Sequence, residues 1–216
     1  MNQASIETAY NKYSGVYDRI FGRVFENGRN KAVQMIPLSG QERILEVGVG
    51  TGISLTKYPR TVGVVGIDLS EDMLKKAQER VERYALTNVE LLLANAEEMS
   101  FQRNHFDKVI IMYVLSVTPN PEILLEKALD VCKEGGEVII VNHFSEKKLF
   151  KKLSSSELSR RIERRLGFRV YFPMKKYIEH INTLGHSCTD VKSANYGLSK
   201  IIKIKKNGVG VYADNA

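Results

Sequence analysis

Three glycines and one aspartate are spaced as a bound nucleoside would require. Gly48, Gly50 and Gly52 follow an apolar run that ends at Val47, in the stretch ILEVGVGTG. Glycines at this spacing let the backbone approach a ligand closely, because no side chain intervenes. Asp68 ends the next apolar run, twenty positions after Gly48, where its carboxylate can accept hydrogen bonds from both ribose hydroxyls. This pairing favours a nucleoside site over the alternative of a tight turn and a helix-capping Asp.

The glycine stretch departs from the two common phosphate-binding motifs. A dinucleotide fingerprint, Gly-x-Gly-x-x-Gly, would need glycine where the chain has Ile53. A phosphate loop would need Gly-Lys-Ser or Gly-Lys-Thr, and the sequence contains neither. We therefore expect a nucleoside ligand without phosphates.

Polar residues end two further apolar runs. Tyr113 follows KVIIM, and Asn142 and His143 follow GEVIIV. In a parallel sheet, such residues lie at the carboxyl ends of the strands, beside the ligand crevice. The ordinary pKa of His143 is near neutral, so its ring could accept a proton from a substrate. The alternatives are a loop histidine held by a backbone bond and a core role for Tyr113.

Strand-like and helix-like patterns alternate through most of the chain. Strands are expected at 43–48, 64–69, 89–94, 108–117 and 136–142, and helices at 70–84, 121–132 and 174–185. Ser70 should cap the first of these helices, and Gly185 should end the last. Two more strands, 188–193 and 198–205, should form an antiparallel hairpin at the sheet edge. The alternation predicts an α/β fold with helices on both faces of a parallel sheet.

The first residues form an aromatic amphipathic pattern. At helical spacing, one stripe roughly 140° wide gathers Tyr10, Tyr13, Tyr17, Ile20, Phe21, Val24 and Phe25. We interpret about 8–36 as a helix that covers the crevice, with Tyr13 and Tyr17 as catalytic-pocket residues. The alternative is an ordinary core face.

Positive charge is concentrated in one segment. Residues 143–176 contain eleven Lys and Arg against three Glu, a net charge of +8, whereas the whole chain carries +7. Within this segment, residues from about 144 to 172 form two amphipathic pieces with apolar stripes and basic faces. This pattern is typical of helices lying on an anionic bilayer. Each base near such a surface contributes about 1 kcal/mol. The alternative is a solvated face of a surface helix.

Four motifs in order resemble the class I S-adenosylmethionine-dependent methyltransferases. The first is Glu46-x-Gly48-x-Gly50-x-Gly52 followed by GIDLS; the others are NVELLLANAEEMSF, FDKVIIMYVLSV and KEGGEVIIVNHF, so the likeness spans about 44–144. It implies a Rossmann-like fold with a seven-stranded, mostly parallel sheet and an antiparallel edge strand. It also implies S-adenosylmethionine as cofactor and S-adenosylhomocysteine as product.

The resemblance also assigns cofactor-binding residues. It places the methionine end of the cofactor at the glycine turn, the ribose at Asp68 and Leu69, and the adenine at Asn95 and Ala96. The family usually has Asp at position 95, where it accepts a bond from the adenine amino group. An Asn oxygen can accept the same bond without a charge, which makes a weaker bond.

Further strings resemble the soluble-type bacterial phosphatidylethanolamine N-methyltransferases. These are YNKYSGVYDRIFGRVFENGR, EVGVGTGISL, MYVLSVTPNP and VIIVNHF. The resemblance implies stepwise methylation of a phospholipid amine towards phosphatidylcholine, by a cytoplasmic enzyme on the inner face of the cytoplasmic membrane. The ubiquinone/menaquinone C-methyltransferases share the cofactor motifs and are the main alternative. Transfer to an amine needs positioning and a neutral acceptor, and no metal.

Other classes are less well supported. A nucleic-acid methyltransferase would also be basic, but an amino-directed one would carry Asp/Asn-Pro-Pro-Tyr/Phe where this chain has MYVLSVTPNP, so we expect no nucleic-acid partner. A non-catalytic binding protein is a further alternative. Cys132 and Cys188 show no metal-ligand spacing. The start of the chain lacks signal-peptide features, and we expect one domain over 1–206 followed by a flexible tail, 207–216.

Overall fold

The computed structural model describes residues 25–145, 169 and 171–208. The strands are β1 (Arg43–Val47), β2 (Gly63–Asp68), β3 (Val89–Leu93), β4 (Phe106–Met112), β5 (Cys132–Asn142), β6 (Ser187–Ala194) and β7 (Ser199–Lys205). The helices are α2 (Glu26–Gln34), α3 (Glu71–Arg83), α4 (Pro121–Val131) and α7 (Met174–Thr183), with short 3-10 turns η2 (Leu55–Lys57) and η3 (Asn195–Gly197). Within the described ranges, no helix is long and apolar enough to cross a membrane.

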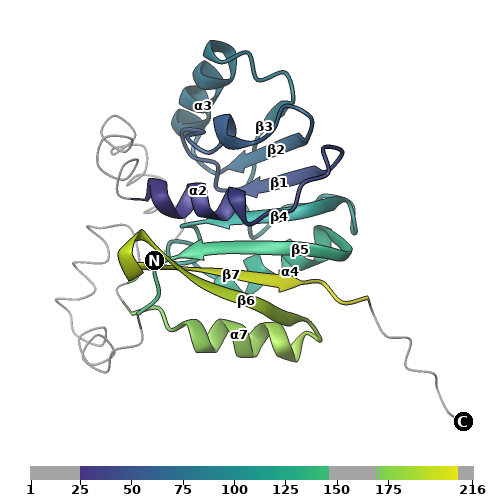
Figure 1. Cartoon of the computed structure of the whole chain (residues 1–216), viewed down its shortest axis with the longest axis vertical. Coiled ribbons are helices and arrows are strands. Elements are labelled where there is room, and N and C mark those ends of the chain that lie inside the picture. Colours follow the sequence, from purple (N-terminus) through teal and green to yellow (C-terminus); the bar gives the residue numbers. More distant parts are fainter. Residues whose placement is uncertain (1–24, 146–168, 170, 209–216) are drawn as a thin grey trace, which may run out of the picture.

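All seven strands form one sheet in the order β3-β2-β1-β4-β5-β7-β6 (Figure 1). Strands β1 to β5 pair with one another in parallel, and β7 pairs antiparallel with both β5 and β6. The predicted mostly parallel sheet with an antiparallel hairpin at one edge is therefore confirmed. The strand order reverses between β1 and β4, and a ligand crevice is expected beyond the carboxyl ends of strands at such a point.

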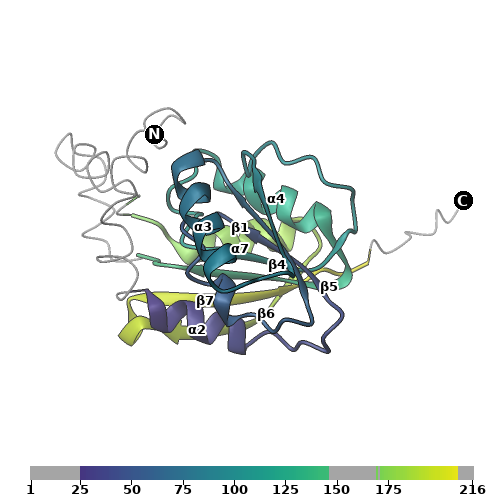
Figure 2. The same ribbon diagram turned by 90° about the horizontal axis from the view of Figure 1, so that it is seen from above.

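Helices cover both faces of the sheet, as predicted. Side chains of α4 and α7 pack with one set of strand residues, including Leu45, Val109 and Ile140. Side chains of α2 and α3 pack with the alternate set, including Ile44 and Ile110. Figure 2 shows α2 and α4 on opposite sides of the sheet. The alternation follows from strand geometry, in which successive side chains point to opposite faces.

Local signals in the sequence set several element boundaries. The Ser70 side chain accepts a bond from the Met73 amide (3.2 Å) and caps α3, as predicted. Gly185 adopts a φ of +79° just after α7, consistent with its expected role as a helix terminator. Strand β5 begins earlier than expected, at Cys132, because a register shift between Phe106 and Lys108 lets its first residue pair with β4.

Three predicted segments lie largely or wholly outside the described residues. Of the proposed cap helix at 8–36, only the part from residue 25 is described, and Glu26–Gln34 is helical. The basic amphipathic segment at about 144–172 falls mostly on 146–168, of which nothing is described. Most of the proposed tail, from 209 onward, is likewise outside the described ranges.

Candidate functional site

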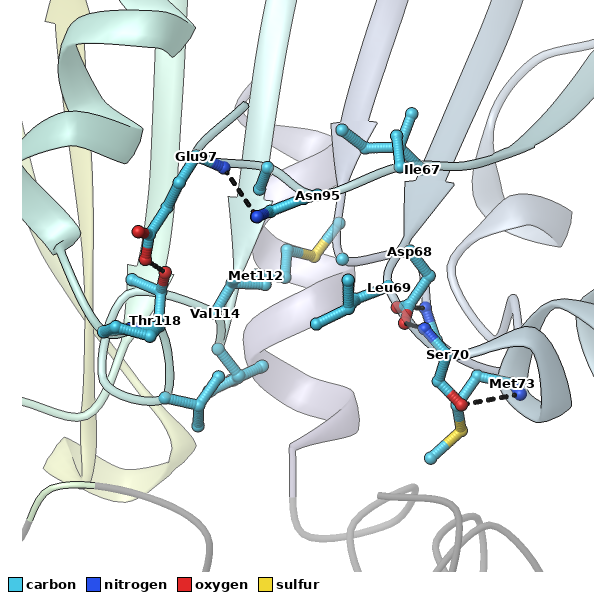
Figure 3. Close-up of a pocket in the computed structure, with 17 residues that line it drawn as sticks. Ile67, Asp68, Leu69, Ser70, Met73, Asn95, Glu97, Met112, Val114 and Thr118 are labelled. Carbon is cyan, nitrogen blue, oxygen red and sulfur yellow. Dashed lines mark hydrogen bonds between the residues drawn. The ribbon is translucent and has the colours of Figure 1, made fainter. Parts of the chain in front are cut away.

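A cleft opens at the carboxyl ends of β1, β2, β3 and β4. Its empty space is about 870 Å³ when the solvent at its open mouth is counted. Its walls are formed by 67–70, 94–97, 112–114 and 117–119, together with Gly48, Gly50 and Met73 (Figure 3). The cleft therefore occupies the position that the strand order indicates.

The glycine turn forms the floor of the cleft. Gly48 and Gly50 line it, whereas Gly52 packs behind it against α3. A Cβ atom on Gly48 would lie 2.2 Å from a methyl carbon of Val114, and the residue has a φ of +70°. Only glycine satisfies both conditions, because other residues rarely adopt this backbone and the neighbouring side chain fills the space.

Asp68 is fixed at the end of β2 by two backbone amides. Its Oδ2 accepts from the Gly50 amide (2.8 Å) and its Oδ1 from the Ser70 amide (2.9 Å). Burial raises the pKa of the Asp68 carboxyl, and the amide bonds oppose this rise. The bonds also join the glycine turn to β2, so one carboxylate both orders the turn and lines the cleft beside it.

Glu46 lies behind the glycine turn and is nearly inaccessible to solvent. Its carboxylate accepts bonds from the Ser54 hydroxyl and from the Tyr58 hydroxyl, the latter at 2.7 Å. Burial raises the pKa of Glu46, and the two hydroxyl bonds and nearby Arg29 oppose the rise. Glu46 and Arg29 line a smaller hollow that adjoins the cleft through Gly48 and Gly50. The predicted Glu46 therefore lies in the hollow next to the cleft that Asp68 lines.

The remaining predicted cofactor residues also line the cleft, Leu69 beside Asp68 and the other two after β3. Leu69, Asn95 and Ala96 all line it. The Asn95 Oδ1 accepts a bond from the Glu97 amide (3.0 Å), which orders the turn that follows β3. The side-chain oxygen expected to face adenine is thus already an acceptor for the backbone, with one further lone pair available.

Glu97 is a site residue that the sequence reasoning missed. Its carboxylate accepts from the Thr118 hydroxyl and from the backbone and side chain of Asn120, both at 2.8 Å. Burial acts to raise the pKa of Glu97, but these bonds and the charge of Arg169 outweigh it and lower the pKa. Glu97 ties the turn after β3 to the loop after β4, a long-range pairing that no local pattern predicts.

Tyr113 lines the cleft but its hydroxyl points behind it. The hydroxyl accepts a bond from Asn195 Nδ2 (2.7 Å), and the ring stacks on Phe25 with 4.3 Å between centroids. Burial raises the pKa of Tyr113, and the bond from Asn195 opposes this. The ring therefore shapes the cleft while the hydroxyl holds α2 and the β6–β7 turn. Its proposed catalytic role stays a prediction.

Asn142 and His143 lie behind the loop that forms one cleft wall, and neither is among the lining residues. Ser116 in that loop lies 3.4 Å from Asn142 Oδ1 and 3.4 Å from His143 Nδ1. The His143 Nε2 lies 2.8 Å from the Arg169 carbonyl, to which it donates when that nitrogen carries the proton. Burial lowers the pKa of His143, which favours the neutral ring, and the Arg169 bond opposes the change. The geometry agrees with the alternative of a loop histidine held by the backbone; a proton-accepting role stays a prediction.

Tyr13 and Tyr17 lie outside the described residues.

Comparison with known proteins identifies the family. A family profile described as a methyltransferase domain matches residues 38–190. Phosphatidylethanolamine N-methyltransferase of Cereibacter sphaeroides is 42% identical over 149 residues, covering 68% of this chain and 72% of that protein. Demethylmenaquinone methyltransferase of Oceanobacillus iheyensis is 31% identical, covering 62% of this chain and 58% of the relative, so the match spans less than two thirds of it.

A solved structure shows the same fold. Phosphoethanolamine N-methyltransferase 2 of Haemonchus contortus, in complex with phosphomonomethylethanolamine and S-adenosylhomocysteine, superimposes with a TM-score of 0.70 at 20% identity. The match covers 90% of this chain and 57% of that one. Together with the strand order and the cleft at its reversal point, the profile and the 42% identical relative place this chain in the methyltransferase-domain family.

Proposed function

We propose that this methyltransferase transfers methyl groups from S-adenosylmethionine to the amine of phosphatidylethanolamine, stepwise towards phosphatidylcholine. The observation that carries the proposal is the 42% identity to the Cereibacter sphaeroides enzyme, which extends over 149 residues. We further propose that the reaction takes place with the protein bound peripherally at the inner face of the cytoplasmic membrane.

The cleft residues support the donor. The Asp68 carboxylate can accept bonds from the ribose hydroxyls, and the turn at Asn95 and Ala96 would face the adenine. The methionine end would lie over Gly48 and Gly50, where the absence of side chains allows close approach. When bound, the cofactor supplies an electrophilic methyl group. The task left to the protein is to hold a neutral amine in line with that group and to exclude water.

The ends of the basic segment support a membrane-bound acceptor. On one side, the Ser145 amide donates to the Phe172 carbonyl (2.9 Å). On the other, the Arg169 guanidinium donates to the carbonyls of Thr118 (2.6 Å) and Pro119 (2.7 Å), residues of the cleft wall. Residues 146–168 contain eight Lys and Arg against three Glu, and Arg169, which follows them directly, contacts the cleft wall. Positive charge there would bring an anionic bilayer to the site that methylates the lipid head group.

The second candidate is a quinone C-methyltransferase, which the Oceanobacillus iheyensis relative favours. Methylation of a ring carbon requires an enolate or phenolate as nucleophile, whereas methylation of an amine requires only its neutral form. The two candidates use the same cofactor cleft, so the acceptor distinguishes them.

The deciding experiment supplies both acceptors at once. The protein is incubated with methyl-labelled S-adenosylmethionine and vesicles that contain phosphatidylethanolamine, phosphatidylglycerol and a demethylated quinone, and the lipids are then separated by chromatography. We expect label in mono- and dimethylated phosphatidylethanolamine and in phosphatidylcholine. Label in the quinone and not in the amine lipids would reverse the order of the two candidates. The Asp68→Ala variant should give no label and serves as the negative control.

A second measurement tests the role of charge. Co-sedimentation with vesicles should require anionic lipid and should weaken as salt is raised, because the screening length falls to about 10 Å at 0.1 M. Binding that depends on neither lipid charge nor salt would contradict the proposed electrostatic attachment.

A further inference from the structure

The turn η3 between β6 and β7, together with the residue that follows it, exposes two large apolar side chains. Tyr196 is fully exposed, at 102% of its reference area, and Leu198 is 65% exposed. Figure 1 shows this turn at the end of the sheet to which the parallel strands point, the end that carries the cleft. The strand register agrees, since Lys200 at the start of β7 pairs with Asn142 at the end of β5.

The backbone of this turn holds Tyr196 outward in an unfavourable conformation. Asn195 and Tyr196 have φ angles of +48° and +55°, in the left-handed region. Asn tolerates this region, but a bulky aromatic residue there costs roughly 1 kcal/mol or more. Such outliers persist only where the surrounding structure fixes them, and they cluster at functional positions.

Asn195 fixes the turn through a buried network. Its Oδ1 accepts from the Gly28 amide of α2 (2.9 Å), and its Nδ2 donates to the Tyr113 hydroxyl (2.7 Å) and the Ser199 hydroxyl (3.0 Å). Because Tyr113 lines the cleft, one hydrogen bond links the base of the turn to the cleft wall. The turn therefore has a set position relative to the cofactor site.

Two lysines contact Ser193, close to the end of β6 that leads into the turn. The Lys31 ammonium lies 3.4 Å from the Ser193 carbonyl and the Lys200 ammonium lies 2.7 Å from the Ser193 hydroxyl, which brings both charges to one residue of β6. Neither lysine forms an ion pair with a carboxylate of the described residues. Uncompensated positive charge beside exposed Tyr and Leu side chains is the combination that binds an anionic lipid interface, because Tyr prefers the head-group level and lysines attract anionic lipids.

We infer that η3 is a membrane contact separate from the basic segment, in which Tyr196 and Leu198 enter the head-group region of an anionic bilayer while Lys31 and Lys200 bind lipid phosphates. This contact would fix the distance and tilt of the cleft relative to the bilayer surface. It deepens the proposed function, on which it rests for the membrane as the location of the substrate.

The test measures flotation of the full chain with vesicles of phosphatidylglycerol and phosphatidylcholine, and with vesicles of phosphatidylcholine alone. The double variant Tyr196→Asn/Leu198→Ser should bind the anionic vesicles roughly tenfold more weakly. Its melting temperature should be unchanged or raised, because Asn adopts the left-handed backbone at lower cost. The matched control is Tyr84→Asn/Leu184→Ser, exposed residues that end α3 and α7 at the opposite end of the sheet, and it should bind like the unmodified protein.

The charge is tested in the same way. Lys31→Gln/Lys200→Gln should also weaken binding, by roughly 25-fold, since each base near the surface contributes about fivefold. Lys127→Gln/Lys205→Gln removes the same charge elsewhere and should have a smaller effect. Equal losses in test and control pairs, or unchanged binding of the Tyr196 double variant, would overturn the inference.

Methylation separates this inference from the proposed function. Phosphatidylethanolamine dispersed in detergent micelles should be methylated by the Tyr196 double variant at the normal rate, and vesicles more slowly. If micellar lipid is methylated but the Tyr196 double variant binds vesicles as well as the unmodified protein, the membrane contact at η3 is refuted and the proposed function stands. Vesicle binding that depends on η3 without any methylation of the lipid would refute the function and leave the contact.

Discussion

Replacement of Asp68 tests the cofactor site most directly. The carboxylate accepts two backbone amide bonds, from Gly50 and Ser70, and each oxygen retains a lone pair that can accept a ribose hydroxyl. In Asp68→Asn, the side-chain NH₂ must face one of these donors, so one backbone bond and the charge-assisted bonds to ribose are lost together. A hydrogen bond to a charged group contributes about 1.5 to 3 kcal/mol.

A loss of about 2 kcal/mol weakens binding roughly thirtyfold. We expect this loss for Asp68→Asn and a larger one for Asp68→Ala, which leaves no acceptor for the ribose hydroxyls. Titration calorimetry with S-adenosylmethionine and with S-adenosylhomocysteine measures both. The control is Asp72→Asn, a carboxylate in the first turn of α3 that lies near Lys75, which should leave affinity unchanged.

The pH dependence of binding supplies a second readout. Because burial raises the pKa of Asp68, the carboxyl takes up a proton at a higher pH than an exposed Asp would as solution is acidified. Protonation replaces an acceptor with a donor, so affinity for the cofactor should fall with decreasing pH in the unmodified protein and should depend less on pH in Asp68→Asn. Unchanged affinity in Asp68→Asn and Asp68→Ala, with native melting behaviour, would refute the assignment of ribose binding to this residue.

Three other substitutions test the site and its frame. Gly48→Ala should lower the free energy of unfolding by about 2 kcal/mol, measured by denaturant titration, because the new methyl group meets Val114 and the backbone is left-handed; equal stability would contradict the close packing. His143→Ala should lower the methylation rate. Loss of the acid limb of the pH–rate profile in this variant would show that His143 accepts the proton of the substrate amine. An unaltered profile would leave His143 only the role of positioning Ser116 and Arg169. Glu42→Gln should flatten the dependence of melting temperature on pH between about 4.5 and 2. Slight burial acts to raise the pKa of Glu42, but hydrogen bonds from Ser39 and Gly40 lower the pKa from 4.5 to about 2. The ionised carboxylate therefore stabilises the fold fully above pH 4.5, and this stabilisation is lost as the pH falls towards 2. A curve as steep as that of the unmodified protein would contradict this.

Most of the fold could be predicted from local patterns. Short apolar runs alternate with helical periodicity, and capping residues such as Ser70 mark where helices begin. These signals depend on neighbours within a few residues, so the elements can be predicted without knowledge of the tertiary structure. The start of β5 was misjudged because its first residues pair with β4 through a register shift, a contact between distant segments.

The cofactor side of the cleft could also be predicted, since its residues follow strand ends in the sequence. Gly48, Gly50 and Asp68 were placed there by their position after apolar runs, and Leu69 and Asn95 by the family resemblance; the structure brings them together. Parallel strands gather their carboxyl ends at one edge, so the order of motifs in the chain is enough to predict proximity.

Local sequence patterns thus predict the alternation of elements, the glycine turn with its acid, and the concentration of positive charge in one segment. The directions of the side chains at the strand ends depend instead on tertiary packing: the Tyr113 hydroxyl turns to Asn195, and the His143 ring contacts Ser116 and Arg169. The same is true of Glu97, which joins two loops, and of the exposed turn at Tyr196. The physical reason is that these features depend on partners more than twenty residues away, whose positions are fixed only when the sheet and its helices pack together.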